Sequence, residues 1–256
     1  MLLFTLQGAE AFGLLLVRCI SFFIAGPIFA QRGIPAHIKI MLGAACTLLL
    51  WPLVPSADLP AAGSLIAFLI AVAGETFLGI LLGLAAALPF AGLRMAGSLV
   101  GVQMGFGIVN VWSPQDEGQV SIIGGFYGIL ALILFLVLDG HHLLLRAMGM
   151  SLKVVPLGGA LFSAPLLAQI VGMAGSLFVV AVAVGGPLIA VLFLADAAMG
   201  FVARTVPQMN IFIVGFPVKI GLGLLGIAVT LPFFNRTVGH LISGIEHDLL
   251  LLLAGM

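Results

Sequence analysis

Residues 97–119 read GSLVGVQMGFGIVNVWSPQDEGQ, and this stretch determines how the rest of the chain is interpreted. It begins with Gly97, Gly101 and Gly105, whose four-residue spacing places bare backbone along one helix face. Such a face lets a neighbouring helix approach closely within a membrane. An apolar run and a Pro-containing acidic turn follow. We therefore expect a helix that gives way to a non-helical apolar loop enclosed by protein, since lipid leaves exposed backbone polar groups unsatisfied.

The composition is that of an integral membrane protein. Of its 256 residues, 62% are hydrophobic and only 7% are charged, and the mean hydropathy is +1.34. Soluble domains carry about 25% charged residues. Segments 76–93, 118–138 and 154–195 hold no charge, and about 20 apolar residues suffice to cross a bilayer. The nine positive and nine negative residues cancel, so net charge gives no argument for a nucleic-acid partner.

Hydrophobic runs predict an all-α fold, a polytopic helical membrane protein with about six long hydrophobic helices and a broken or re-entrant stretch around 105–119. The expected helical segments are 11–30, 40–54, 65–91, a glycine-rich helix from 97, 120–138, 166–204 and 209–234. A short polar turn joins the last two into a helical hairpin. We place a division near residue 160, which separates 1–160 from the hairpin part, 161–256. Gly79 and Gly83 form a second small-residue face.

Ionisable side chains inside apolar runs are costly and default to a functional hypothesis. The candidates for intramembrane charges or contacts between subunits are Arg18, Glu75, Asp196, Arg204 and Lys219. Arg204 lies near a turn, where extension of the side chain to the membrane surface explains it. Glu75 and Lys219 lie within long runs and are predicted to join a buried pair or to meet a partner subunit. The sequence does not say which residues pair.

Motifs for catalysis are missing from the sequence. It contains no G-x-S-x-G, no H-E-x-x-H and no phosphate-binding G-x-x-x-x-G-K, the patterns that would indicate a nucleophile, a zinc protease or a nucleotide site. An intramembrane aspartyl protease would need two apposed aspartates, whereas Asp139 and Asp196 lie at the ends of runs without suitable surroundings. We predict that the protein is not an enzyme and has no catalytic residues.

Histidines give little support for a metal. His141 and His142 follow Asp139, but adjacent residues on a helix point about 100° apart, and a complete site needs more ligands. His240 and His247 share a helix face beside two acidic residues, which is typical of a solvated helix end. We predict no metal and no cofactor.

The apolar loop allows two interpretations. One is an ordinary packed connection between two helices. The other is a gate, because an apolar constriction closes a pore by excluding water and flexible glycines let it move aside. The residues that would form such a plug are Met104, Gly105, Phe106, Gly107, Ile108, Val109, Val111 and Trp112.

Three stretches together resemble one known family. Arg18 with GPIF at 26–29 and GIP at 33–35 is the first, and Gly74–Glu75 with the glycine-rich helix is the second. The third, and the most specific, is QMNIFIVGFPVKI at 208–220. This combination resembles the FliR family of flagellar biosynthesis proteins and its injectisome relatives over essentially the whole chain. The family-motif positions are Gly74, Gly97, Gly101, Gln103, Pro207, Gln208, Asn210, Gly215 and Pro217.

The resemblance implies a subunit of the type III secretion export gate. Family members assemble with about five copies of the P component and about four of the Q component of the flagellar export apparatus. Their fold is like a P component, here 1–160, fused to a Q-like hairpin, here 161–256. The loop matching 105–119 plugs the pore of the closed gate, within a gasket of partner methionines.

The same resemblance implies the wider setting. Other partners are the A and B components of the export gate, the ring and rod proteins of the basal body, and unfolded protein substrates. The location implied is the bacterial inner membrane within the flagellar basal body, with part of the assembly above the bilayer in the periplasm. No nucleic acid is expected.

A different class of function remains open from the residues alone. A secondary transporter for a small solute would use broken helices and charges within its spans, although no inverted repeat is evident. The leading hypothesis is a non-enzymatic export-gate subunit, flagellar rather than injectisome by overall resemblance. Few cations lie between the spans, so the positive-inside rule does not fix the orientation.

Overall fold

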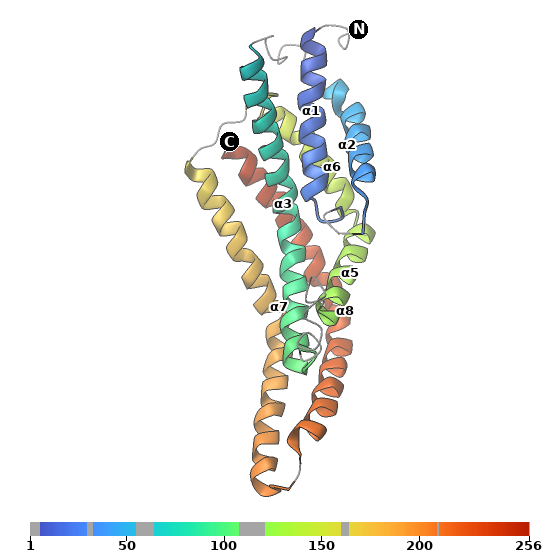
Figure 1. The fold of residues 1–256 in the computed structure, drawn as a ribbon, viewed down its shortest axis with the longest axis vertical. Coiled ribbons are helices and arrows are strands. Elements are labelled where there is room, and N and C mark those ends of the chain that lie inside the picture. The colour runs from blue at the N-terminus through green and yellow to red at the C-terminus, as the bar shows by residue number, and fades with distance from the viewer. Residues whose placement is uncertain are drawn as a thin grey trace. The chain divides into compact units, whose positions relative to one another are not determined.

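The computed structural model describes residues 6–29, 33–54, 64–107, 121–159, 164–208 and 210–255. Within these ranges the chain is built of helices and short turns (Figure 1). The elements are α1 (Leu6–Ala25), α2 (Ala36–Leu50), the short 3₁₀ helix η2 (Trp51–Leu53), α3 (Leu65–Met104), α5 (Ile122–Val137), α6 (Gly140–Val154), α7 (Ala164–Thr205) and α8 (Ile211–Ala254).

The predicted fold class is confirmed. Among the described residues, five helices are long and apolar enough to cross a membrane, or six if α5 and α6 together make one bent span. The bend between α5 and α6 is 72° and falls at Asp139, whose φ of 56° lies in the left-handed region. The protein is therefore an all-α polytopic membrane protein, and α7 and α8 form the expected C-terminal hairpin.

Two predicted boundaries were wrong. The sequence suggested that a span ends near Arg94 and that a new helix starts at Gly97, but α3 is one helix of 40 residues with Pro89 inside it. Arginine is a good helix former, and the Arg94 side chain is exposed, so it does not end the helix. Similarly, α8 runs 44 residues to Ala254 instead of ending at 234.

Packing groups the chain into two compact units, each made of separate stretches of sequence. The first contains Met1–Leu88, Leu136–Ala174 and Ile242–Met256, and the second contains Pro89–Phe135 and Gly175–Leu241. The predicted division rests on the resemblance of residues 1–160 to the P component and of residues 161–256 to the Q component. Contacts within one chain do not test it, and it stays a prediction.

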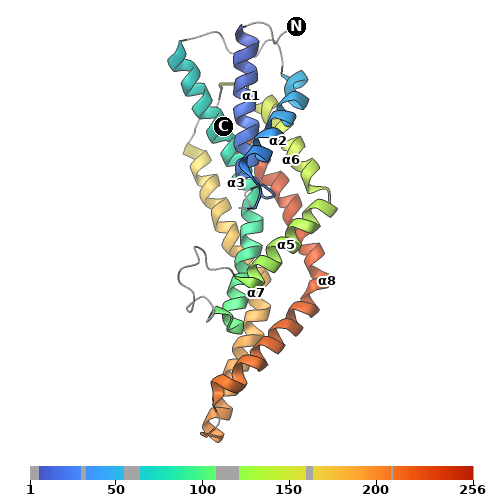
Figure 2. The same cartoon turned by 45° about the vertical axis from the view of Figure 1, so that its right-hand side comes forward.

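In the first unit, α1 lies between α2 and the start of α3, as both views show (Figures 1 and 2). Glycines on α3 make the approach possible. A Cβ atom on Gly79 would lie 2.5 Å from the carbonyl oxygen of Arg18, and one on Gly83 would lie 2.6 Å from that of Phe22. The second predicted glycine face therefore accepts the backbone of α1.

In the second unit, the C-terminal half of α3 packs against α5 and the hairpin. A Cβ on Gly97 would lie 2.7 Å from the carbonyl oxygen of Ile123, at the start of α5. A Cβ on Gly92 would lie 2.9 Å from the carbonyl oxygen of Leu177, on α7. The helix therefore uses two glycines to receive two different neighbours.

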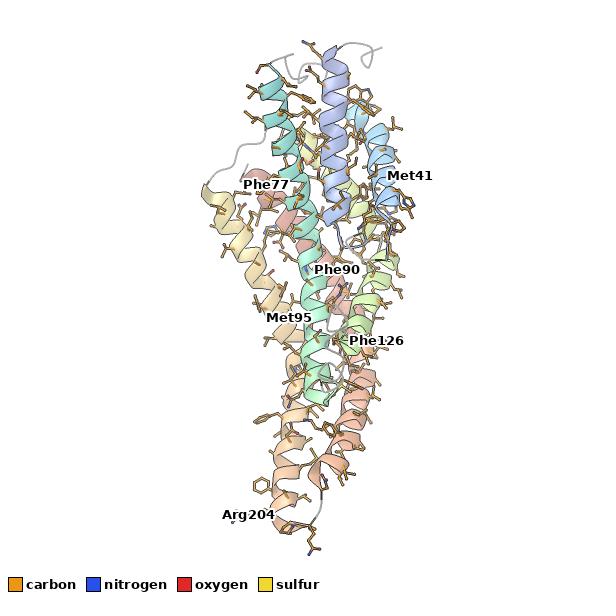
Figure 3. All side chains as sticks on the ribbon, viewed as in Figure 1. Met41, Phe77, Phe90, Met95, Phe126 and Arg204 are labelled. Atoms are coloured by element: carbon orange, nitrogen blue, oxygen red, sulfur yellow. The ribbon has the colours of Figure 1, made fainter. Side chains whose placement is uncertain are left out.

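The side chains that remain exposed are largely apolar. Figure 3 shows Met41, Phe77 and Phe126 standing on the outside of their helices, and their exposed fractions are 68%, 44% and 44%. A water-soluble protein would bury such residues. Here lipid or other proteins must cover them, in keeping with a membrane location.

Candidate functional site

Four of the five predicted charges form two ion pairs in the structure. In the first unit, Arg18 on α1 meets Glu75 on α3, and both side chains are 0% exposed. Arg18 donates two hydrogen bonds, from Nε to Glu75 Oε2 and from Nη2 to Oε1 at 2.9 Å. This fork geometry is among the strongest that an arginine and a carboxylate can form.

The remaining polar atoms of this pair also have partners. Arg18 Nη1 donates to the carbonyl oxygens of Val155 at 3.1 Å and Ser151 at 3.3 Å, at the end of α6. The backbone N–H of Gly158 donates to Glu75 Oε1 at 2.8 Å. Val155 is the residue just past α6, and the Ser151 carbonyl also accepts the N–H of Val155 at 2.9 Å, so the arginine adds to the hydrogen bonds at the C-terminal end of α6. The pair thus ties together α1, α3 and the end of α6.

Such an enclosed pair is structural. A charge in a low-dielectric interior is tolerated only when it is paired and hydrogen-bonded, and here both conditions are met. With no exposed surface on either side chain, the pair offers nothing to a transported solute or polypeptide.

The second pair lies in the second unit and is only partly enclosed by the chain. Lys219 on α8 approaches Asp196 on α7, with Nζ 2.8 Å from Oδ1, and their side chains are 16% and 36% exposed. Gln103, in the last turn of α3, donates from Nε2 to Asp196 Oδ2 at 2.9 Å. One carboxylate therefore links three helices.

The end of α3 lies next to this carboxylate. The N–H of Gly105 donates to the carbonyl of Val102, and that of Phe106 donates to the carbonyl of Gly101, both at 3.0 Å. Gly105 has a φ of +100°. These are the hydrogen bonds and the left-handed residue of a Schellman motif, which ends a helix. Gly105 therefore lies just past the helix, whereas its spacing suggested a third position on the helix face.

The α7–α8 hairpin contacts this helix end through residues that sequence reasoning missed. A Cβ on Gly105 would lie 2.7 Å from the ring of Phe216, and one on Gly223 would lie 2.5 Å from Met104. Met104 is 0% exposed. It is part of the packed core, and its predicted place in the plug stays a prediction. Phe216 belongs to the 208–220 motif, which was the available signal.

The predicted plug is only partly described. Phe106 and Gly107 are half-buried, and Gly107 has no neighbour closer than 3.8 Å to the place of a Cβ. The other predicted plug residues lie outside the described residues; they are Ile108, Val109, Val111 and Trp112.

The remaining family-motif positions lie mainly at the hairpin turn. Asn210 immediately precedes α8, and its backbone carbonyl accepts a hydrogen bond from the N–H of Ile213 at 3.1 Å. Pro207 and Gln208 are exposed. Figure 3 shows Arg204 at the same end of the hairpin, directed away from it. Its predicted role as a membrane-surface or subunit contact stays a prediction.

Gly215 on α8 faces Met199 on α7, and a Cβ added to Gly215 would lie 3.1 Å from the Met199 sulfur. Pro217 lies inside α8. In the first unit, Gly74 is half-buried beside Glu75. Gly215 therefore contributes packing near the second ion pair, whereas Pro217 is exposed.

His141 and His142 lie closer together than sequence spacing suggested. Their ring centroids are 4.1 Å apart, and His142 Nδ1 lies 3.3 Å from Asp139 Oδ1. Arg146 lines the adjacent pocket of about 410 Å³. That cation and the positive N-terminal end of α6 both disfavour a bound metal. Even so, one ligand atom from each of Asp139, His141 and His142 lies within 4.8 Å of the others, close enough to meet at one ion. The prediction of no metal therefore stays a prediction.

Fold and sites together define an all-α polytopic membrane protein whose internal charges are paired within the chain and whose third helix ends at a glycine held by the hairpin. Residues 9–245 match the model of the bacterial export proteins, family 1, and the chain belongs to this family.

Relatives agree over nearly the whole length. The flagellar biosynthetic protein FliR of Bacillus subtilis (strain 168) is 34% identical over 239 residues, 91% of this chain and 90% of that protein. FliR of Pectobacterium carotovorum subsp. carotovorum is 30% identical, over 89% of this chain and 86% of that protein. FliR of Escherichia coli (strain K12) is 28% identical, over 90% and 87%.

Proposed function

We propose that this chain is a subunit of the flagellar type III secretion export gate, where it forms the central pore that conducts unfolded flagellar and secreted proteins across the inner membrane. The observation that carries the proposal is the match to an export family and to FliR proteins over about nine-tenths of the chain. The proposed role is non-enzymatic. Since the sequence has no nucleotide-binding motif, partners would supply the energy for export.

Helix lengths support protein partners. Helices α7 and α8 contain 42 and 44 residues, and at 1.5 Å per residue they are about 63 and about 66 Å long. The hydrocarbon core of a bilayer is about 30 Å thick, and a tilt of about 0–40° does not reconcile these lengths. In an apolar 18-residue window of each, only 22% and 17% of the residues are buried within the chain.

More apolar helix is therefore present than a bilayer covers. We propose that the P component, about five copies, and the Q component, about four copies, cover the rest, with part of the complex in the periplasm. The A and B components of the gate and the basal-body ring and rod would adjoin this core.

The closed gate must also retain ions while remaining able to pass an unfolded chain. We propose that the apolar loop 105–119 seals it as a plug, because an apolar constriction excludes water. Its support in the structure is the abrupt end of α3 at Gly105, from which the loop begins.

Assembly and sealing are tested together. Native mass spectrometry of the chain expressed with the P and Q components should find one copy in a defined multi-subunit complex. Replacing residues 106–112 with small side chains should raise ion leak in cells that carry the assembled gate. A monomer or homodimer indifferent to the partners, or an unchanged leak with assembly intact, would contradict the proposal.

The alternative is a secondary transporter of a small solute. The partly exposed Asp196 is the observation in its favour, since an ionisable residue inside an apolar helix can mark a substrate pathway. Solute binding by the isolated chain, measured by calorimetry, would favour it over the gate.

A further inference from the structure

The last turn of α3 is linked to the hairpin by a single carboxylate. Gln103 donates to Asp196 Oδ2 at 2.9 Å, and Lys219 donates to the same oxygen at 2.9 Å. The two donors come from different helices, and the positive charge of Lys219 compensates the negative charge of Asp196. Charge-assisted hydrogen bonds of this kind are shorter and stronger than neutral ones.

Apolar contacts fix the neighbouring residues. Met104 fills the space left by Gly223, and Phe216 covers the face of Gly105 where a Cβ would stand. The residues at 103, 104 and 105 therefore each meet the α7–α8 hairpin. Phe216, within the 208–220 motif, and Gly223, shortly after it, provide two of these contacts.

We propose that Asp196 is a positioning residue that anchors the last turn of α3 to the hairpin and so fixes where the chain leaves the helix. The inference rests on the proposed function, because the segment that begins there is the one assigned to the seal. A displaced helix end would move the start of that segment, and the seal would fit its surroundings less well. The anchor thus gives the 208–220 motif a role in holding the gate closed.

The decisive variant is Gln103→Met, which removes the hydrogen bond from α3 and leaves the Asp196–Lys219 pair intact. Hydrogen–deuterium exchange in the assembled complex should then be roughly ten-fold faster at the amides of Gly105 and Phe106. This factor corresponds to the local stability lost when a charge-assisted hydrogen bond is removed. These two amides report the hydrogen bonds that end α3.

A matched control uses the same substitution in the first unit. Gln169→Met, where the side-chain oxygen has no hydrogen-bond partner among the described residues, should leave exchange at Gly105 and Phe106 unchanged. Asp196→Leu, which removes both acceptor oxygens, should act like Gln103→Met. Both anchor variants should also raise ion leak several-fold while the complex still assembles.

Each outcome decides a separate point. Unchanged exchange at Gly105 and Phe106 in Gln103→Met would overturn the anchor, whatever the leak. Faster exchange with an unchanged leak would keep the anchor and contradict the plug in the proposed function. Loss of assembly in Gln103→Met, but not in Gln169→Met, would give the contact a purely structural role and overturn the proposal.

Discussion

The Arg18–Glu75 and Asp196–Lys219 ion pairs differ in how completely the chain itself encloses them. Arg18 and Glu75 are 0% exposed and are enclosed by further hydrogen bonds. Asp196 and Lys219 are 36% and 16% exposed, and one carboxylate oxygen is shared between donors from two helices. Similar charges in similar apolar runs thus form a fully buried ion pair in one place and a partly exposed ion pair in the other.

Solvent access predicts different consequences for disruption. When one partner of a fully enclosed pair is removed, the other stays charged in a site without water. The full desolvation penalty of that charge then lowers the stability of the fold. A partly exposed group can recover hydration, so the loss is smaller. We therefore expect the first pair to maintain the fold and the second to be adjustable.

The largest effect is expected for Glu75→Gln. It leaves the Arg18 guanidinium buried without its counter-charge and should lower the free energy of unfolding by about 3–5 kcal/mol. Denaturant titration in detergent, followed by circular dichroism, measures it. The double variant Arg18→Met with Glu75→Leu should recover most of the loss, because no charge is then buried. A double variant as unstable as the single one would contradict this account.

Gly79→Ala should also weaken the first pair, by displacing α1. The added Cβ would lie 2.5 Å from the backbone oxygen of Arg18, an atom that cannot rotate away, so α1 and α3 must separate. A loss of about 1–3 kcal/mol is expected in the same titration. Gly172→Ala in α7 is the control, since a Cβ there has nothing within 4 Å. Equal losses in the two variants would refute the close-approach explanation.

Gly105→Ala tests the helix end beside the second pair. Its φ of +100° is a conformation that costs a residue with a side chain about 1–2 kcal/mol, and the methyl group would also meet Phe216. The free energy of unfolding should fall by about that amount. Gly107→Ala, two residues further on, would add only an ordinary van der Waals contact with Val102 at 3.8 Å and should change little. The prediction fails if the two alanines behave alike.

The smallest effect is expected for Lys219→Met. Asp196 remains partly hydrated, so the loss should be about 1 kcal/mol or less. This loss should shrink at high salt, because screening acts on pairs that solvent reaches, whereas the loss in Glu75→Gln should not. Titrations of both variants at low and high salt therefore compare the two pairs directly. An equal salt dependence would remove the distinction.

The sequence was sufficient for the membrane class and for most of the helices, since both follow from long uncharged runs. It failed at the length of α3, where Arg94 suggested an end. Contacts of Gly92 with α7 and Gly97 with α5 carry the helix through this region. Packing of this kind overrides local preference, and a single sequence does not display it.

The sequence identified the charged residues of the site but not which of them pair. All four paired charges stood out because each lies in an apolar run, yet which acid meets which base depends on distances across the fold. The role of Gly105 was likewise hidden. Its spacing from Gly97 and Gly101 indicates one helix face, and only the backbone conformation shows that the helix has already ended.

By itself, the sequence determined that this protein lies in a membrane, that it is helical and that it resembles an export family, because hydropathy and motif spacing are properties of the chain alone. The tertiary structure decided which charges are sealed and which remain open to water, and it placed the end of α3 against the hairpin. Burial and hydrogen bonding arise only when distant segments meet, so no local pattern could have specified them.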